Sequence, residues 1–575
     1  MLWNVKESCP KAVQKFSQEI GVSELVSNLL IQRDMLSVDG AEYFLNPSLK
    51  NLSDPYAIKN LKVGVEQLSR AIDRRDSIFI FGDYDVDGIT SIVQILSILR
   101  FYGLAPSYCV PHRLYEGYGM SRQAIDRALS GGKPDMMIVV DCGTNSKESI
   151  DYLSSLGISL IVIDHHKLTE SYPKSCTLIN PHVNDLGQEE QPWYNLSAAG
   201  LVFKFLHGLI KYRRAQADSI AERIRLSDII DLAGMGTIAD LVPLLGENRI
   251  IAWYGLKHLS SNKRTGIVAL IEASRMGIGQ SLTSSDISFR LGPRINASGR
   301  LADASLPVEL LLSKDSLFSK KSAQELERLN YERQSIERSI TKSAVSLIEA
   351  SDENTSGYVL YDEAWHSGVV GIVASRVSRL YNRPCIVLGN DGSVIKGSGR
   401  SVPGVDLVHV LKECEAYLEN WGGHPMAVGI SLLPDQLESF SLAFDQNMKK
   451  LYPNGISEPE LEIASWIDFT AIGDGLLSDL AKLQPFGQGN PEPVFGLKGV
   501  ILKSPPIQFG KKHKKFILTQ EGQMDKEVEG IAWNANALPE PNQEVDLAVR
   551  IETHTWNNQK SLRVILVDWR KSGIL

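Results

Sequence analysis

The sequence lacks paired cysteines, long apolar runs and low-complexity tracts. Its six cysteines are scattered along 575 residues, and no two have the two-residue separation of zinc ribbons and redox motifs. No apolar run approaches the ~20 residues that a membrane helix needs, and the start lacks the basic and then apolar pattern of an export signal. We therefore expect a soluble, cytoplasmic protein that has reduced thiols and does not act at a membrane.

An excess of basic residues is also missing. Lys and Arg number 60 against 68 Asp and Glu, which gives a formal net charge of -8. Nucleic-acid binders are usually basic, so this balance disfavours one if charge is read globally. Acidic residues gathered around bound cations, however, raise the negative count without repelling a phosphate chain, because the cations invert the local field. The composition therefore leaves a nucleic-acid substrate open.

The chain is too long for a single core, and its length suggests roughly three or four domains. Between about 61 and 250, apolar strands such as 77–81 alternate with amphipathic helices such as 63–72 and 91–101. This alternation predicts a parallel sheet covered by helices on both faces. Residues 1–60 before it form a predicted N-terminal helical cap.

The second half of the chain changes its pattern twice. A long polar helix is predicted over 315–350, followed by a second α/β unit with strands at 358–361 and 385–388 and a helix at 370–380. Beyond 451, short β-type runs between turn residues predict a small β-barrel. We therefore divide the chain into 1–60, 61–314, 315–350, 351–450 and 451–575.

Four apolar segments each deliver acidic residues, or an acidic residue with histidines, at their end. These residues are Asp83, Asp85 and Asp87 after 77–81, Asp141 after 137–140, Asp164, His165 and His166 after 160–163, and Asp240 after 229–238. Sites in parallel sheets lie outside the carboxyl ends of the strands. The pattern therefore predicts one site built from all four segments.

The alternating aspartates of the first segment repel one another unless a cation binds them. A calcium loop would need a glutamate at position 94, where the sequence has Gln94. Oxygen ligands mixed with one or two imidazoles suit manganese or magnesium better than structural zinc. We predict a pair of divalent metal ions, Mn²⁺ or Mg²⁺, that share a carboxylate.

These segments resemble a known family. Residues 81–88, 141–143, 164–166 and 236–240 resemble, in order and spacing, the four motifs of the DHH phosphoesterase superfamily. Residues 291–301 and Gly422-Gly423-His424 narrow the resemblance to its RecJ branch of single-strand-specific exonucleases. The resemblance implies an α/β fold: a parallel-sheet DHH domain, a long helix, a second α/β (DHHA1) domain and a C-terminal OB-fold barrel. Pyrophosphatase relatives have histidine where this chain has Phe81, which weighs against that activity.

The resemblance also implies roles for the acidic cluster. Asp85 and Asp87 would each hold one metal ion, with Asp141 bridging the two. His165 and Asp240 would complete the second site, and Asp83 would join the first. Asp164 would then orient an imidazole, as metal-bound histidines usually require. His166 would donate to a phosphate oxygen.

Substrate contacts are predicted in two Gly/Ser-rich turns. Arg294 and Arg300 flank the first, which contains Asn296 and Ser298, and the second holds Ser398 and Arg400. Forked guanidinium groups beside small residues suit a terminal phosphate. The resemblance implies that both turns read a 5′ phosphate and that Gly422, Gly423 and His424 contact the substrate.

Two further segments are candidates for holding a strand. Arg113 and Tyr115 could line a groove for single-stranded DNA, although ordinary loop packing stays an equal alternative for the tyrosine. The run from Lys511 to Phe516 predicts a basic hairpin beside aromatics, as a single-strand-binding OB fold would use.

The expected protein is a single-stranded-DNA-specific 5′ to 3′ exonuclease of DNA repair and recombination that releases 5′-mononucleotides by two-metal hydrolysis. We expect a monomer that works with a helicase and a single-strand-binding protein. Two alternatives stay open. One is a hydrolase of short oligonucleotides or cyclic dinucleotides, against which the C-terminal barrel argues. The other is a non-catalytic single-strand-binding scaffold, against which the intact acidic motifs argue.

Overall fold

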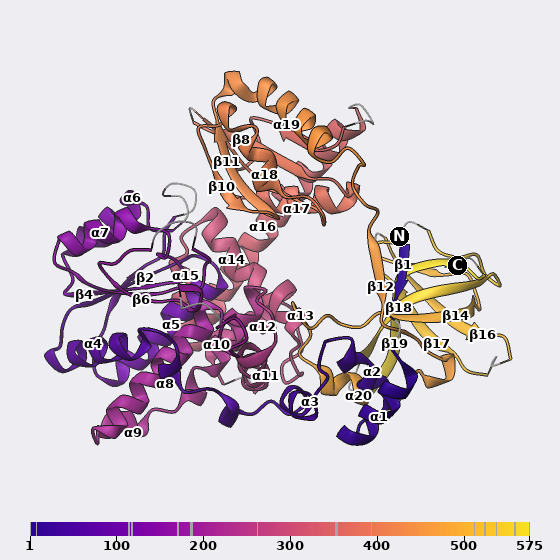
Figure 1. The fold of residues 1–575 in the computed structure, drawn as a ribbon, viewed down its shortest axis with the longest axis horizontal. Coiled ribbons are helices and arrows are strands. Elements are labelled where there is room, and N and C mark those ends of the chain that lie inside the picture. The colour runs from indigo at the N-terminus through magenta and orange to yellow at the C-terminus, as the bar shows by residue number, and fades with distance from the viewer. Residues whose placement is uncertain are drawn as a thin grey trace. The chain divides into compact units, whose positions relative to one another are not determined.

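The computed structural model describes residues 2–6, 8–112, 116, 119–168, 172–183, 188–261, 263–350, 355–392, 394–510, 512–522, 525–535, 537–556 and 559–573. The chain forms two compact units (Figure 1). One comprises Met1–Leu52, Pro243–Trp253 and Pro459–Leu575, and the other Ser53–Val242 and Tyr254–Glu458. None of the helices in the described ranges has the length and apolar character to cross a membrane.

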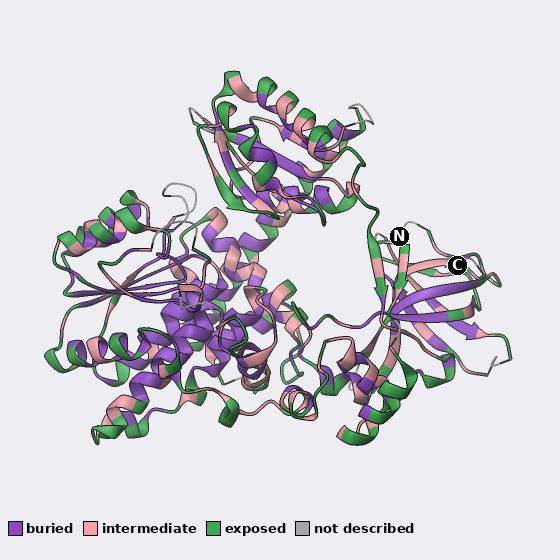
Figure 2. Ribbon diagram, viewed as in Figure 1, coloured by how far each residue is buried: buried purple, intermediate pink, exposed green. Residues whose placement is uncertain are grey.

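The larger unit contains the predicted parallel sheet. Its strand order is β3-β2-β4-β5-β6, and every pairing is parallel. The strands are β2 (Ile78–Gly82), β3 (Ser107–Cys109), β4 (Met136–Val140), β5 (Ser159–Ile163) and β6 (Thr177–Ile179). All five residues of β4 are buried, because helices cover both faces. Figure 2 shows this buried sheet between helices whose outer sides are exposed.

Helices from different parts of the chain cover the two faces of the sheet. The first face carries α4 (Leu61–Arg74), α5 (Val86–Phe101) and α8 (Ala198–Ala215), and the second carries α6 (Arg122–Ala128) and α7 (Lys147–Ser155). Ile125 and Ile150 of the second face share a core with Val139 and Val162 of the strands. On the first face, a Cβ on Gly64 would lie 3.0 Å from Ile179 and 3.2 Å from Phe205, so the helices lie close on the sheet.

A helical segment continues from this sheet. Its elements are α9 (Ser219–Arg223), α10 (Ile230–Ala239), α11 (Gly246–Ser260), α12 (Thr265–Ala273), α13 (Ser284–Asp286), the π-helix Ile287–Leu291, α14 (Gly292–Leu301), α15 (Ser305–Leu312) and α16 (Ser316–Glu349). The long helix α16 confirms the one predicted over 315–350. Asp315 caps it by accepting from the N–H groups of Leu317 and Phe318, and its buried face includes Leu326 and Leu329.

A second, mixed sheet follows α16 and confirms the predicted second α/β unit. Its order is β10-β11-β9-β8-β7, with only β7 and β8 parallel. The strands are β7 (Tyr358–Tyr361), β8 (Cys385–Asp391), β9 (Val394–Arg400), β10 (Asn420–His424) and β11 (Ala427–Leu432). One face is covered by α17 (Val370–Tyr381), the other by α18 (Leu407–Lys412) and α19 (Leu437–Leu451).

The smaller unit contains the predicted β-barrel. Strands β14, β18, β19, β17 and β16 pair in that order, and β14 pairs with β16 to close the barrel. Their bounds are β14 (Phe495–Leu502), β16 (His513–Gln520), β17 (Val528–Ala532), β18 (Glu544–Trp556) and β19 (Gln559–Lys571). The shorter strands β13 (Ser465–Trp466) and β15 (Ile507–Phe509) extend the sheet, and β1 (Leu2–Val5) pairs with β12 (Glu460–Ile463).

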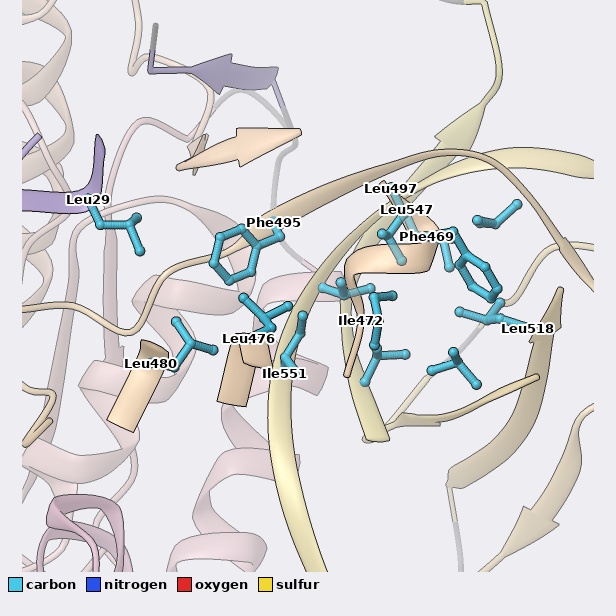
Figure 3. Packing of buried hydrophobic residues seen from close by; sticks show 14 of the residues in the cluster. Leu29, Phe469, Ile472, Leu476, Leu480, Phe495, Leu497, Leu518, Leu547 and Ile551 are labelled. Carbon is cyan, nitrogen blue, oxygen red and sulfur yellow. The ribbon is translucent and has the colours of Figure 1, made fainter. Parts of the chain in front are cut away.

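The N-terminal helices share the core of this barrel unit. They are α1 (Pro10–Ile20), α2 (Glu24–Ile31) and α3 (Val38–Leu45), and they meet α20 (Asp474–Leu483). Leu29 belongs to one buried cluster with Leu480, Phe495 and Ile551 (Figure 3). Deleting the chain from 451 onward would therefore expose apolar residues of the N-terminal helices to water.

Arg249 joins the first turns of α11 to this unit. Its guanidinium is buried and donates to the carbonyl oxygens of Phe44 (2.7 Å), Leu483 (3.1 Å) and Gln484 (2.8 Å). It also lies 3.6 Å from the centre of the Phe44 ring. Segments far apart in the sequence are thus tied through one side chain.

Both predicted Gly/Ser-rich turns were wrong, since each is regular structure. Residues 292–301 form helix α14, which starts at Gly292-Pro293, because proline suits the first turn of a helix. Residues 397–400 belong to strand β9. Their glycines serve close packing: a Cβ on Gly299 would lie 2.7 Å from the Tyr84 ring, and one on Gly397 would lie 2.1 Å from the Val387 carbonyl oxygen.

Candidate metal centre

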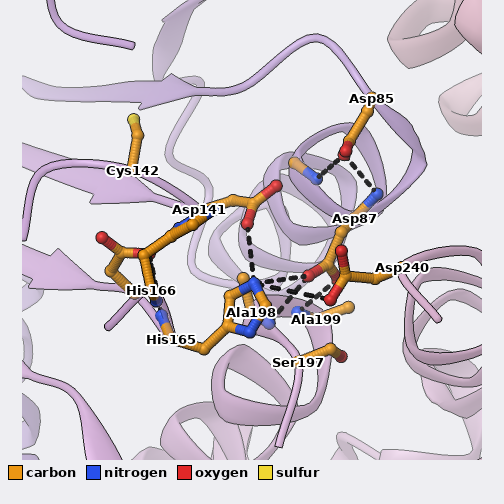
Figure 4. Close-up of polar contacts among 12 residues, drawn as sticks. Asp85, Asp87, Asp141, Cys142, His165, His166, Ser197, Ala198, Ala199 and Asp240 are labelled. Carbon is orange, nitrogen blue, oxygen red and sulfur yellow. Dashed lines mark hydrogen bonds and ion pairs between the residues drawn. The ribbon is translucent and has the colours of Figure 1, made fainter. Parts of the chain in front are cut away.

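Three neighbouring parallel strands and one helix end at the same place. Strands β2, β4 and β5 are adjacent, so the residues that follow them, Asp83, Asp141 and Asp164, lie at one edge of the sheet. Asp240 follows helix α10 and faces the same site (Figure 4). The ends of the four separate segments thus lie close together.

Backbone N–H groups hold Asp85 and Asp87. Helix α5 begins at Val86, a few residues earlier than predicted, and Asp85 caps it by accepting from the N–H groups of Asp87 (2.9 Å) and Gly88 (3.2 Å). Asp87 is buried, and its two oxygens accept from Ala198 N and Ala199 N, both at 2.8 Å. These two N–H groups lie in the first turn of α8, where the helix dipole favours a carboxylate.

Backbone conformation positions Asp83 and Asp141. A Cβ on Gly88 would lie 2.3 Å from the Asp83 carbonyl oxygen, so only glycine allows the turn that brings the aspartates together. Asp141 has φ 60, in the left-handed region, while its N–H still donates to Ile163 at 3.0 Å. The chain thus leaves β4 by a sharp turn directly at this carboxylate.

His165 lies at the centre of the carboxylates. Its Nε2 is 3.4 Å from Asp141 Oδ1, 3.5 Å from Asp240 Oδ2 and 3.8 Å from Asp87 Oδ2 (Figure 4). These carboxylates come from three of the four segments. One imidazole nitrogen therefore faces oxygen atoms that lie up to 153 positions apart in the chain, from Asp87 to Asp240.

Asp164 and His166 form a separate pair beside this centre. Asp164 Oδ1 accepts from the N–H groups of His165 (2.8 Å) and His166 (3.2 Å) and lies 2.7 Å from His166 Nδ1. Its other oxygen accepts from Thr144 N at 2.9 Å. The Asp164 carboxylate thus holds the backbone of both histidines and the ring of His166, and the orienting role expected of it stays a prediction.

Burial and crowding shift the pKa values of the cluster. Burial, with the neighbouring Asp85, raises the pKa of Asp87 to about 7. Burial and the charge of Asp87 raise the pKa values of Asp141 and Asp240 well above the ordinary range. Burial, with His166 beside it, lowers the pKa of His165 to about 3, so its imidazole is neutral, the form that binds metals.

The pair beside the centre shifts in opposite directions. Burial alone would lower the pKa of His166, but the charge of Asp164 raises it to about 9. Burial alone would raise the pKa of Asp164, but His166 lowers it well below its usual range. His166 therefore carries a positive charge at neutral pH.

Sequence reasoning missed several residues that fix this geometry. Asn180 is buried and donates to Thr144 Oγ1 (2.8 Å) and to the His166 carbonyl oxygen (2.9 Å). It directly follows β6, so the strand-end rule that located the other residues could have found it. A Cβ on Gly236 would lie 2.8 Å from Asp87 Oδ1. Gly236 falls in the motif at 236–240, but the sequence does not indicate this close approach.

The donor set fits a divalent cation. Three groups of potential ligand atoms each lie within 4.8 Å of one another: Asp83, Asp85 and Asp141; Asp87, His165 and Asp240; and Asp141, His165 and His166. Among the described residues, His165 Nε2 and Asp240 Oδ2 are buried without a hydrogen-bond partner. Oxygen atoms with imidazole nitrogen and no thiolate suit Mn²⁺ or Mg²⁺.

Three of the residues predicted to bind the terminal phosphate, Arg300, Ser398 and Arg400, lie at the start of helix α17; we call them the phosphate cradle. Arg300 Nη1 donates to the Gly368 carbonyl oxygen at 3.0 Å, just before the helix. A Cβ on Gly371, in the first turn, would lie 3.2 Å from Ser398 Oγ and 3.5 Å from Arg400 Nη2. Residues 398 and 400 are two positions apart on β9, so their side chains lie on the same face of the sheet, the face that α17 covers.

Gly422, Gly423 and His424 join this group through the sheet. His424 pairs with Ala427, which pairs with Arg400, and Gly422 reaches Ser398 through Gly429 in the same way. Burial and the charge of Arg400 lower the pKa of His424. A Cβ on Gly423 would lie 2.3 Å from the Ala427 carbonyl oxygen, and its φ of 146 also requires glycine.

The other predicted substrate residues are placed differently. Arg294 Nε is 2.6 Å from Glu327 of α16, and its Nη1 donates to the Arg290 carbonyl oxygen. Ser298 is buried and donates to Ile295 within its own helix. Asn296 Oδ1 is buried and, within the described ranges, accepts no hydrogen bond. Arg113 and Tyr115 lie outside the described residues.

Comparison with known proteins agrees with this architecture. Family models match residues 77–237 (DHH family, N-terminal domain), 354–450 (DHHA1 domain) and 463–568 (RecJ OB domain). The single-stranded-DNA-specific exonuclease RecJ of Bacillus subtilis (strain 168) is 30% identical over 579 residues, which cover 99% of this chain and 70% of that protein. The chain belongs to the RecJ family.

Solved structures of the RecJ family have the same fold. RecJ from Thermus thermophilus in complex with Mn²⁺ is similar with a TM-score of 0.81 at 27% identity, covering 100% of this chain and 80% of that one. The complex of the same protein with Mg²⁺ gives a TM-score of 0.77 at 26% identity, covering 100% and 79%. The predicted DHH, DHHA1 and OB-fold architecture is thus confirmed, and the acidic cluster together with these metal-bound relatives supports divalent-metal binding.

Proposed function

We propose that this RecJ-family chain is an exonuclease that hydrolyses single-stranded DNA from its 5′ end and releases 5′-mononucleotides. The observation that carries the proposal is the position of His165 Nε2, 3.4 to 3.8 Å from carboxylates of three separate segments. The DHH, DHHA1 and RecJ OB family models that match the chain support the substrate class. In the reaction, water adds to phosphorus and the bond to the 3′ oxygen of the terminal nucleotide breaks.

We infer two divalent cations, Mn²⁺ or Mg²⁺, that share Asp141. Asp83 and Asp85 would complete the first set of ligands, and Asp87, His165 and Asp240 the second. In support, Asp141 lies within 4.8 Å of ligand atoms from Asp83 and Asp85, and its Oδ1 is 3.4 Å from His165 Nε2. Bound there, divalent cations would lower the pKa of water and stabilise charge on the phosphoryl oxygens.

Asp164 and His166 act on the phosphate. Asp164 accepts from His166 Nδ1 and fixes the ring, and we infer that this ring donates to a phosphoryl oxygen. The high pKa of His166 keeps this donor charged at neutral pH. Charge-assisted hydrogen bonds of this kind stabilise the negative charge that develops as water attacks.

The second α/β unit, which contains β7 to β11 and α17, binds the 5′ end of the strand. Arg300, Ser398 and Arg400 offer guanidinium and hydroxyl donors at the start of α17, whose dipole also favours a phosphate. His424, with Gly422 and Gly423, contacts the terminal nucleotide from the neighbouring strand. Binding of the strand end at this position would favour exonuclease over endonuclease action.

The setting of the reaction follows from its substrate. A single strand must be supplied, so we infer that a helicase and a single-strand-binding protein act with this enzyme in DNA repair and recombination. We also infer a monomer, because the acidic cluster and the residues at the start of α17 belong to the same unit of one chain. We further infer that it acts in the cytoplasm.

The proposal is tested by product analysis on single and double strands labelled at either end, with Mn²⁺, Mg²⁺ or chelator. We expect 5′-mononucleotides from single strands and only in the presence of metal. A label at the 5′ end should be released before a label at the 3′ end. Asp141→Ala should abolish cleavage but keep strand binding, while the matched control Asp435→Ala, on the surface, should cleave normally. Preference for a dinucleotide over a long strand would favour the small-substrate alternative, and binding without any cleavage would favour the scaffold.

A further inference from the structure

A pocket of about 250 Å³ lies in the larger unit at the start of helix α12, and we call it the α12 pocket. It adjoins the first turn of α10, whereas Asp240 of the acidic cluster directly follows the last residue of that helix. Since α10 has 10 residues, its two ends lie about 15 Å apart. The α12 pocket is therefore separate from the metal centre.

Arg264 occupies the acceptor groups beside this pocket. Its Nε and Nη2 donate to the two carboxylate oxygens of Asp231, at 2.7 and 3.0 Å. The same guanidinium donates to the carbonyl oxygens of Asp228, at 2.9 Å, and Leu311, at 3.2 Å. These oxygens are already paired within the protein, so they do not select a ligand that donates hydrogen bonds.

Hydrogen-bond donors at the same place are unpaired. Helix α12 begins after Arg264, and no side chain caps its first turn. Among the described residues, no acceptor pairs with the N–H groups of Thr265, Gly266 or Ile267. Gly266 and Ile267 are buried, where an unpaired N–H group costs free energy. Together with the positive end of the helix dipole, these donors suit an oxyanion.

Two lysines make the pocket positive. Lys263 and Lys314 line it and are exposed, and neither forms an ion pair within the described part of the chain. Burial, with the charge of Lys263, lowers the pKa of His258, which also lines the pocket. The exposed carboxylate of Asp228 opposes the two ammonium groups, since Asp231 is paired with Arg264. A net positive charge remains, although the whole chain carries -8.

We propose that the α12 pocket binds the phosphate group of a small phosphomonoester. The N–H groups of the first turn of α12 donate to the phosphoryl oxygens, and Lys263 and Lys314 balance the negative charge. The pocket is larger than a phosphate requires, and Leu311 and Leu312 line it, so it also has room for an organic group. A 5′-mononucleotide has this chemistry, but the site itself does not depend on the proposed nuclease function.

Hydrogen exchange followed by mass spectrometry locates the ligand on the full-length chain. The probes are thymidine 5′-monophosphate, inorganic phosphate and thymidine, with chelator present so that no metal ion binds the acidic cluster. The first two should slow exchange in a peptide that spans 263–270, because bound oxygens protect the N–H groups there. Thymidine, which lacks the phosphate, should not. Protection at other places only, or none at all, would overturn the proposal.

Thr265→Pro removes one N–H donor and is compatible with the backbone. Thr265 is the first residue of α12, where proline is tolerated. Arg264 before it has φ -91 and ψ 117, the extended conformation that a residue preceding proline needs. Thr265→Pro should weaken binding of thymidine 5′-monophosphate by about 10- to 100-fold with an unchanged melting temperature. Thr265→Ala keeps the N–H group and should bind more tightly than Thr265→Pro.

Charge variants complete the test, with affinity read from the protection of the 263–270 peptide at rising ligand concentration. Lys263→Ala combined with Lys314→Ala should weaken binding of the phosphate by roughly 2- to 30-fold. Lys62→Ala, on the exposed face of α4, should bind as the wild type does. Equal affinities of Thr265→Pro and Thr265→Ala, or an unchanged affinity in the double lysine variant, would refute the proposal.

The α12 pocket and the nuclease fail independently. Arg400→Ala, at the phosphate cradle, should leave protection of the 263–270 peptide unchanged, because that residue lies outside the α12 pocket. Protection of this peptide that disappears in Arg400→Ala would overturn the separate site. A chain that never cleaves DNA with metal would refute the proposed function, and the measurements on the α12 pocket, which need no metal, would still stand.

Discussion

Gly236 in helix α10 offers a severe steric test of the metal centre. A Cβ there would lie 2.5 Å from Ala199 Cβ, 2.5 Å from Thr90 Oγ1 and 2.8 Å from Asp87 Oδ1, whereas ordinary contacts begin at 3.4 Å. Gly236→Ala must therefore push α8 and α5 away by several tenths of an ångström. The N–H groups of Ala198 and Ala199, which hold Asp87 at 2.8 Å, would move with α8.

The magnitude follows from overpacking and from the lost support of a ligand. Overpacking costs roughly 1–3 kcal/mol, which lowers the melting temperature by about 2–12 °C. Displacing groups that orient a metal ligand typically weakens metal affinity by about 10- to 100-fold. Differential scanning fluorimetry and calorimetric titration with Mn²⁺ measure the two effects separately.

The matched control is Gly131→Ala in the same domain. No atom lies within 4 Å of the position that its Cβ would take, so stability and Mn²⁺ affinity should stay near wild type. Wild-type Mn²⁺ affinity in Gly236→Ala would refute the reasoning, because Asp87 could then move without consequence for the ligands.

The other predictions concern three different parts of the chain. Arg400→Ala should lower kcat/KM for 5′-phosphorylated strands by about 10- to 100-fold but change kcat/KM for 5′-hydroxyl strands little. The exposed Arg379→Ala is the control. Equal effects on 5′-phosphorylated and 5′-hydroxyl strands would contradict binding of the phosphate by Arg400. Burial lowers the pKa of His207 from 6.5 to about 4, so the unfolded chain takes up the proton first and stability falls as pH drops through this window. His207→Gln should flatten the melting temperature between pH 6.5 and 4, and an unchanged pH profile would rule out this origin. Arg249→Met should lower the free energy of unfolding of the barrel unit in urea by about 2–5 kcal/mol, because buried carbonyl oxygens lose their donor. The exposed Arg100→Met should have little effect. An unshifted urea midpoint in Arg249→Met would exclude a structural role for Arg249.

The N-terminal helices and the barrel share one hydrophobic core, and this changes how the role of the barrel can be tested. Deleting residues 451–575 would be the obvious experiment from the sequence, in which the barrel is a separate terminal segment. In the structure, Leu29 of the N-terminal helices is buried with Phe495 of the barrel. Loss of strand binding in such a truncation would report on misfolding, so single substitutions on the surface of the barrel are the better test.

Sequence alone located the acidic cluster. Asp83, Asp141 and Asp164 each follow a run of apolar β-type residues, and parallel strands bring their carboxyl ends to one edge. The same periodicity gave the long helix that became α16 and the strands of the second sheet. The segment boundaries, including the cap over 1–60, stay predictions.

Only the tertiary structure decided how these residues are held. The N–H groups that bind Asp87 belong to residues 198 and 199, and the close approach that requires Gly236 involves two other helices. Glycines near 299 and 397 were interpreted as turn residues, although they serve close packing within a helix and a strand. Local patterns record which face of an element is apolar and where the element ends. They do not indicate which backbone groups far away in the sequence a side chain contacts, because those contacts depend on how distant elements pack together.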